Sequence, residues 1–229
     1  VAKCLRMQGK CLYYIKRYDE AWMLMNQALD IAIQIDSKRQ IVACHKQLYY
    51  LCREFKRMMN ERGDEQASTL FFRESLLHEM YFSEKPRLAE LTVRYEALRC
   101  DIMQQYYMNK DYDNVIRIAT SLDFHDDADP NASCLVYYYK AQAYVKLENY
   151  PMAKEAFFRE LELRKKYLGW EEEDTILACQ NLGVLHSFCN EREEALACFR
   201  EAYGYEVKKN GEDSEMAQKL LQYISVVES

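Results

Sequence analysis

Apolar residues recur at helical spacing along almost the whole chain, in stripes separated by short polar segments. In one such stripe Ala21, Met25, Ala28 and Ala32 follow one another at steps of three or four residues, which places them on one face of a helix. Only 6 Gly and 3 Pro occur in 229 residues, so few positions suit the tight turns of an all-β fold. The pattern predicts an all-α chain whose helices are joined by short polar loops.

Three segments, residues 4–32, 136–164 and 178–206, repeat the same arrangement of small and bulky positions. Each has a small residue in a first helix, a second small residue twelve positions later, and a bulky residue four positions after that. These residues are Gly9, Ala21 and Met25, then Ala141, Ala153 and Phe157, then Gly183, Ala195 and Phe199. Two antiparallel helices cross closely only where a small side chain lets the backbones approach. The repeat therefore predicts helix pairs that bury their apolar stripes by stacking on one another.

Two further units diverge from this arrangement. One has Gly63 in its turn, Ser68 at the small position and Phe72 at the bulky one, and the other has Val115 where Ala is expected. The second small positions, residues 21, 68, 115, 153 and 195, are thus separated by 47, 47, 38 and 42 residues. We expect helix pairs at about residues 1–36, 40–82, 87–123, 131–168 and 174–209. A capping helix should follow at 213–228, with Asp213 or Ser214 as its N-cap.

The small–aromatic–small pattern resembles the tetratricopeptide repeat family. The matching residues are Gly9, Tyr18, Ala21 and Ala28, then Ala141, Tyr144, Tyr150, Ala153 and Phe157, then Leu182, Gly183, Ala195, Phe199 and Ala202. The Trp expected early in each first helix is replaced by Leu5, Tyr137 and Cys179, and the closing Pro is absent. The resemblance implies a right-handed superhelical solenoid of about five antiparallel helix pairs with a C-terminal capping helix.

The spacings exceed the 34 residues of the standard repeat. In this the chain is similar to kinesin-light-chain-like repeats and to bacterial sensory and regulatory tetratricopeptide domains. Residues 75–98 resemble the long linking helix of the bacterial group. Since the helical pattern already includes residue 1, we expect a fragment of a longer chain.

The resemblance also implies a concave groove, lined by the first helix of each pair, that binds an extended peptide or a partner helix. The positions that map to this groove are Lys3, Arg6, Lys10, Tyr13, Arg53, Arg57, Gln104, Tyr107, Tyr138, Gln142, Lys146, Gln180, Asn181 and Val184. The N-terminal part of this line is basic, which favours an acidic segment. Alternatively these are solvated helix faces balanced by Glu54, Glu61 and Asp19. Asn181 could equally form a structural hydrogen bond between helices.

Charge and cysteine usage restrict the classes of partner and compartment. The net charge is −6, a poor basis for binding nucleic acid directly. No apolar run reaches the length that crosses a bilayer, so we expect no membrane contact. The nine cysteines form no CxxC, and most lie on apolar stripes as small hydrophobic residues. We expect free thiols in a reducing, cytoplasmic compartment.

Metal and catalytic sites find little support in the sequence. Cys44 and His45 are adjacent and point about 100° apart on a helix, so they and Cys52 do not suggest a zinc site. Another group of metal-type ligands, Cys179, His186 and Cys189, spans about three turns, and His186 takes a packing position of the repeat. We therefore expect a core histidine there, no metal and no cofactor. Catalytic motifs are absent from the sequence.

We therefore expect a non-catalytic scaffold that binds another protein or an extended, acidic peptide. The alternative is a ligand-sensing regulatory domain that controls an attached output domain, such as a bacterial kinase or transcription regulator. The oligomeric state and the partner stay open.

Overall fold

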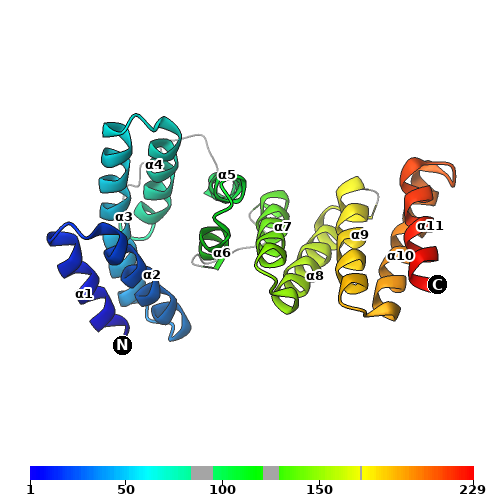
Figure 1. The fold of residues 1–229 in the computed structure, drawn as a ribbon, viewed down its shortest axis with the longest axis horizontal. Helices are drawn as coiled ribbons and strands as arrows, with labels where there is room; N and C mark the ends of the chain where they lie inside the picture. The colour runs from blue at the N-terminus through cyan, green and yellow to red at the C-terminus, as the bar shows by residue number, and fades with distance from the viewer. Residues whose placement is uncertain (84–94, 121–128, 171) are drawn as a thin grey trace. The chain divides into compact units, whose positions relative to one another are not determined.

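The computed structural model describes residues 1–83, 95–120, 129–170 and 172–229, and these residues form eleven α-helices and no strand (Figure 1). The all-α prediction is confirmed for them. The helices are α1 (Ala2–Tyr14), α2 (Tyr18–Gln34), α3 (Lys38–Glu61), α4 (Glu65–Glu79), α5 (Tyr95–Met108), α6 (Tyr112–Thr120), α7 (Pro130–Lys146), α8 (Tyr150–Tyr167), α9 (Glu173–Phe188), α10 (Arg192–Asn210) and α11 (Glu215–Glu228).

The chain forms two compact units, Val1–Gln105 and Tyr106–Ser229. In the first unit α1 packs on α2, α2 on α3, and α3 on α4. In the second, each helix from α6 to α11 packs on the next one in the chain. Contacts between consecutive helices are typical of a helical repeat. The right-handed superhelix stays a prediction.

Each unit has its own hydrophobic core. In the first unit the core joins small residues of α2 to a stripe of α3, and its fully or nearly buried members are Ala21, Met25, Ala28, Leu29, Cys44, Leu48, Leu51 and Phe55. In the second unit the core extends from Ala141 of α7 to Leu220 of α11. The stripes recur at helical spacing, which is why the sequence pattern predicts them.

The predicted close helix crossings are confirmed in the first and fifth pairs. A methyl group on Gly9 would lie 2.9 Å from the Cε atom of Met25, and one on Gly183 would lie 2.8 Å from Cε1 of Phe199. Real side chains essentially never approach so closely, so a larger residue at Gly183 would force the Phe199 ring to move. At Gly9 the end of the flexible Met25 side chain can shift more easily, although the Ala21 carbonyl oxygen would lie only 3.3 Å from the methyl group. Ala21 is fully buried.

One backbone turn recurs between the two helices of every pair. In the fourth pair Glu148 has a φ of 58°, the Glu148 N–H donates to the carbonyl of Val145, and the Asn149 N–H donates to the carbonyl of Tyr144. This is a Schellman motif, in which a left-handed residue ends the helix. The equivalent left-handed residues are Lys16, Gly63, Lys110, Glu148 and Asn190. Each lies five residues before a small position, so the backbone repeats at the spacings predicted from the side chains.

Side-chain caps fix the starts of several helices. The Asp64 carboxylate accepts from the Ala67 N–H, and the Ser214 hydroxyl accepts from the Ala217 N–H. Such caps satisfy backbone donors that have no partner within the helix. The helix predicted at 213–228 is present as α11, which begins after Ser214, packs on α10, and buries Ala217 and Leu220. Its role as a cap stays a prediction.

One packing prediction is wrong. The bulky residue of the second pair that packs against the core is Phe71, which is partly buried and whose ring stacks on Phe55 at a centroid distance of 5.0 Å. Phe72, which the repeat pattern selects, is also partly buried but lines a groove.

Some predicted features lie outside the described residues. These are residues 84–94 of the linking helix and the start and end of the third pair. Among the helices that are described, none combines the length and hydrophobicity needed to cross a membrane. The nine cysteines all lie within the described residues, and none of them forms a disulfide bond.

Candidate functional site

A groove of about 340 Å³ lies between α1 and α3 in the first unit. Its walls are mostly aromatic and aliphatic, and three cations join them. The lining residues are Arg6, Lys10, Tyr13, Tyr14, Met25, Ala43, Lys46, Gln47, Tyr50 and Leu51. None of them is acidic, so the groove combines an apolar surface with positive charge. We call it the α1/α3 groove.

A second groove of about 460 Å³ continues along α3 to α4 and shares Tyr13 and Tyr50 with the first. Its walls are more polar. They are formed by Tyr13, Tyr50, Arg53, Glu54, Lys56, Arg57, Asn60, Phe72 and Ser75. We call it the α3/α4 groove. Together the two grooves include Arg6, Lys10, Tyr13, Arg53 and Arg57 from the predicted contact line.

The cations of these grooves are held in different ways. The Arg57 guanidinium lies 2.6 Å from Glu61 and 3.1 Å from Glu54, and these hydrogen bonds raise the pKa of Arg57. Its charge is therefore balanced locally, as the structural alternative predicts. By contrast, in the part of the chain that the structure describes, no carboxylate forms an ion pair with Arg6 or Arg53.

Other cations of the grooves contact aromatic rings or an amide and not a carboxylate. The Lys10 ammonium is 5.8 Å from the Tyr14 ring centroid, and Arg53 is 5.7 Å from that of Tyr49. Arg6 donates from Nε to the Gln40 side-chain oxygen at 3.3 Å. Such contacts orient the cations and leave their charge available to a ligand.

Sequence reasoning missed several residues of the α1/α3 groove, among them Tyr14, Lys46 and Gln47. Lys46 could have been found, because Lys46, Tyr50, Arg53, Arg57 and Asn60 follow one another at steps of four and three on one face of α3. The Gln47 side-chain oxygen is buried and accepts no hydrogen bond from the described residues. Lys3, which was predicted to contribute, is exposed and lines neither groove.

The second unit has a groove of about 260 Å³ between α7, α8 and α9. It brings together the predicted residues Gln142, Asn181 and Val184. The full lining is Gln142, Val145, Tyr150, Phe157, Asn181, Val184, Leu185 and Phe188. Phe188 is 65% exposed, although its ring packs on Tyr150 at a centroid distance of 5.1 Å. This α7/α9 groove is apolar with two amides.

Besides Lys3, five predicted contact residues line none of these three grooves. Gln104 and Lys146 are exposed, whereas Gln180 is buried. Tyr107 packs against Tyr112 and Tyr139. Tyr138 is half-buried against the core of the second unit, and its burial raises the pKa of its hydroxyl.

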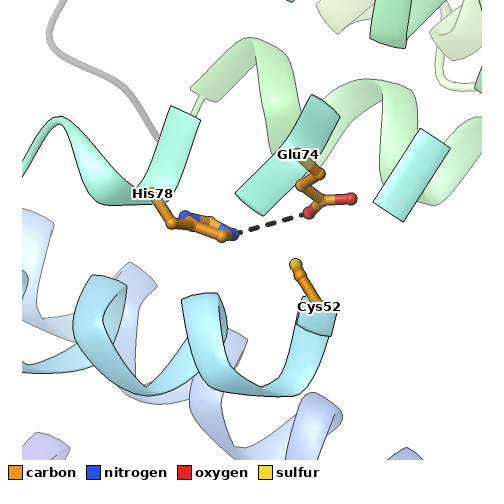
Figure 2. Close-up of side chains that lie close together, drawn as sticks. All are labelled: Cys52, Glu74 and His78. Carbon is orange, nitrogen blue, oxygen red and sulfur yellow. Dashed lines mark ion pairs between the residues drawn. The ribbon is translucent and has the colours of Figure 1, made fainter. Parts of the chain in front are cut away.

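Metal-type ligands gather at one place in the described residues, although the sequence analysis expects no metal site. Cys52 of α3 meets Glu74 and His78 of α4, all three buried (Figure 2). Cys179, His186 and Cys189 form no such cluster, and the Cys179 thiol donates to the Cys198 carbonyl at 3.3 Å.

The prediction that His186 is a core residue is wrong. Its side chain is 18% exposed, and its Nδ1 lies 2.6 Å from the Glu191 carboxylate, which also pairs with Lys154. These two contacts lower the pKa of Glu191. They connect α8 to the turn between α9 and α10.

The comparisons with known proteins leave the family open. No family model matches the sequence. A search of curated proteins finds no match either. The tetratricopeptide resemblance therefore depends on the residues quoted above and stays a prediction.

A buried ion pair lies within the second unit. Arg164 of α8 donates to Glu160 at 2.8 Å and to Asp174, near the start of α9, at 3.2 Å. Burial raises the pKa of Glu160 from an ordinary value of 4.5 to about 7, although the neighbouring Arg164 acts in the opposite direction. The pair lines none of the three grooves, so we assign it a structural role.

Proposed function

We propose that this chain is a non-catalytic, partner-binding module whose first unit holds an extended, acidic segment of another protein. The observation that supports this is the α1/α3 groove, where Arg6, Lys10 and Lys46 surround an apolar surface and no acidic residue joins the lining.

The cations suit a carboxylate-bearing ligand. Hydrogen bonds between ionised partners are shorter and stronger than those between neutral ones. A local positive patch on a chain of net charge −6 also selects where an acidic partner arrives. Arg6 and Arg53, which pair with no described carboxylate, are the best placed for this role.

The apolar walls of the groove suit the side chains that lie between the acidic residues of the ligand. Tyr13, Tyr14 and Tyr50 present flat rings that can cover aliphatic or aromatic groups. Gln47 also lines this groove, and a rotation of its partly exposed side chain would bring its amide within reach of the ligand backbone. The ligand that fits is therefore an extended segment in which acidic and apolar residues alternate.

The α7/α9 groove offers a second place where a peptide can bind, through amides and apolar side chains and not through cations. Its amides, Gln142 and Asn181, can bind a peptide backbone, and the exposed Val184 and Phe188 can cover an apolar side chain. It has no cation in its lining, so this groove should not discriminate acidic from neutral ligands.

A fluorescein-labelled peptide of alternating Glu and Leu residues tests the proposal by fluorescence anisotropy and calorimetry. The double variant Arg6→Glu with Arg53→Glu should weaken its binding roughly tenfold or more. Its helical circular dichroism should stay unchanged, because both side chains are at least partly exposed. A peptide with Lys in place of Glu should bind weakly to the unmodified chain.

A charge-matched control is the double variant Arg39→Glu with Arg62→Glu. Both residues are exposed in the first unit and line neither of its grooves. It should bind the acidic peptide as the unmodified chain does. Equal affinity for all three proteins would contradict the proposal, as would equal weakening in the two double variants.

A further inference from the structure

The interior of the α3–α4 pair contains a compact set of metal-type ligand atoms. The thiol of Cys52, a carboxylate oxygen of Glu74 and a ring nitrogen of His78 all lie within 4.8 Å of one another. His78 Nε2 is 3.6 Å from the nearer Glu74 oxygen, and Cys52 points toward both from the facing helix (Figure 2). The three residues are at most 1% exposed.

Helix geometry explains why these side chains converge. Glu74 and His78 are four residues apart on α4 and therefore share one face. Cys52 lies seven residues after His45 on α3, so these two also share a face. The two faces meet because α3 packs directly on α4.

A second observation concerns how His78 is oriented. Its Nδ1 lies 2.9 Å from Nδ1 of His45, while its Nε2 faces the Glu74 carboxylate. The His45 ring is in turn stacked on Tyr81 at a centroid distance of 3.7 Å. A metal-binding histidine typically binds with one nitrogen and is held by a hydrogen bond at the other. His78 has this arrangement, with His45 as the positioning residue.

We propose that Cys52, Glu74 and His78 form a binding site for Zn²⁺. Sulfur, imidazole nitrogen and carboxylate oxygen are the ligands that zinc prefers. Ligand bonds of about 2.0–2.3 Å place the ligand atoms of a tetrahedral site roughly 3.3–3.8 Å apart. The 3.6 Å between His78 and Glu74 fits this range, and the site closes by a small rotation of Cys52 or Glu74.

The charge of the ion suits this buried position. A thiolate at Cys52 and a carboxylate at Glu74 together neutralise Zn²⁺, so the occupied site has no net charge. The second oxygen of Glu74 or a water molecule completes the four ligands. Zinc here links α3 to α4 and so stabilises α3, the helix that lines both the α1/α3 and the α3/α4 grooves. This inference is independent of the proposed peptide binding.

Cobalt substitution tests the site directly. The chelator-treated chain of 229 residues is titrated with Co²⁺ and then with Zn²⁺. One equivalent of Co²⁺ should produce the d–d absorption of a tetrahedral site and a thiolate-to-cobalt charge-transfer band, and Zn²⁺ should displace both. Cys52→Ala should lose the charge-transfer band, and Glu74→Gln should weaken Zn²⁺ binding at least tenfold.

Two matched controls separate this site from adventitious binding. Cys44→Ala removes a thiol that is equally buried on the same helix but lies outside the ligand set, and it should keep the band. His186→Ala removes a partly exposed histidine of the second unit and should leave the Zn²⁺ affinity unchanged.

Thermal denaturation gives a second readout, which does not depend on the absorption bands of the variants. Saturating Zn²⁺ should raise the Tm of the unmodified chain and leave the Tm of Cys52→Ser, which keeps the side-chain size, unchanged. The proposal is overturned if the unmodified chain shows no saturable binding of one equivalent. It is equally overturned if Cys52→Ala, Cys52→Ser and Glu74→Gln bind Zn²⁺ as tightly as the unmodified chain.

Discussion

Gly183 of α9 and Phe199 of α10 lie so close that a methyl group on the glycine would be 2.8 Å from Cε1 and 2.9 Å from Cδ1 of the phenylalanine ring. Phe199 is 1% exposed, and its ring also stacks on Tyr223 of α11 at a centroid distance of 5.1 Å. The ring is therefore confined by α11 as well as by α9. This single contact sets how closely α9 and α10 can approach.

Gly183→Ala should consequently destabilise the second unit by about 1–3 kcal/mol, the usual cost of overpacking a filled core. The matched control is Gly204→Ala in α10, where a methyl group would meet nothing within 4 Å. That substitution should stabilise the helix by up to about 1 kcal/mol. Urea denaturation followed by circular dichroism compares the two, and equal midpoints for both variants would contradict the packing argument.

The left-handed turn residues predict a stabilising substitution. Glu148 is exposed and has a φ of 58°, a conformation that costs a residue with a Cβ atom about 1 kcal/mol relative to glycine. Glu148→Gly should therefore raise the free energy of unfolding by up to about that amount. Glu155→Gly, at an exposed position inside α8, should lower it by roughly 1 kcal/mol. Thermal denaturation of both variants measures these changes. A loss of stability in both would refute the prediction that glycine is favoured at the left-handed position.

The buried carboxyl of Glu160 predicts a pH dependence of stability. Its pKa is about 7 in the folded chain against 4.5 ordinarily, so the folded state binds the proton more tightly than the unfolded state does. The free energy of unfolding should fall as the pH rises from 4.5 to 7, by roughly 3 kcal/mol from this group. Arg164, Asp174 and Tyr138 are the charged and titratable groups that act on it.

Glu160→Gln should remove this part of the pH dependence. Glu162→Gln, at an exposed position of the same helix, should leave the slope unchanged. Urea denaturation at a series of pH values between 4.5 and 7.5 provides the comparison. A slope in Glu160→Gln equal to that of the unmodified chain would show that Glu160 is ionised throughout.

Lys46 allows a test of the α1/α3 groove that uses a residue found only from the structure. Lys46→Glu should weaken binding of the alternating Glu–Leu peptide about tenfold, because it places a carboxylate in a lining that has none. Lys38→Glu, exposed at the start of α3 and outside the groove, should have little effect. Anisotropy titrations at two salt concentrations provide the measurement, and the difference between the variants should shrink at high salt.

The sequence predicts the helix pairs well because the signals that define them are local. Gly9 and Ala21 lie within one pair, and the steric rule that relates them needs only their spacing and the period of the helix. The N-cap at Ser214 is equally local. For these features the residues near in sequence are also the residues in contact.

Features that depend on the rotation of one helix against another could not be predicted in the same way. Phe71 and Phe72 are adjacent and equally apolar, and only the way α4 packs on α3 decides that Phe71 packs against the core. Cys52, Glu74 and His78 illustrate the same difficulty, because 22 residues separate Cys52 from Glu74. Sequence reasoning tested Cys52 against its neighbours on α3 and not against α4. Within the predicted contact line, it found the cations of α1 and α3 but could not show which of them share a groove.

The left-handed turn is occupied by lysine, glycine, lysine, glutamate and asparagine at its five equivalent positions. Four of these residues are tolerated there and not required, so the shape of the turn does not depend on which amino acid is present. Substitutions at these five positions can therefore leave the helix pairs in phase, so that the surface beside each turn can change while the backbone repeat is kept.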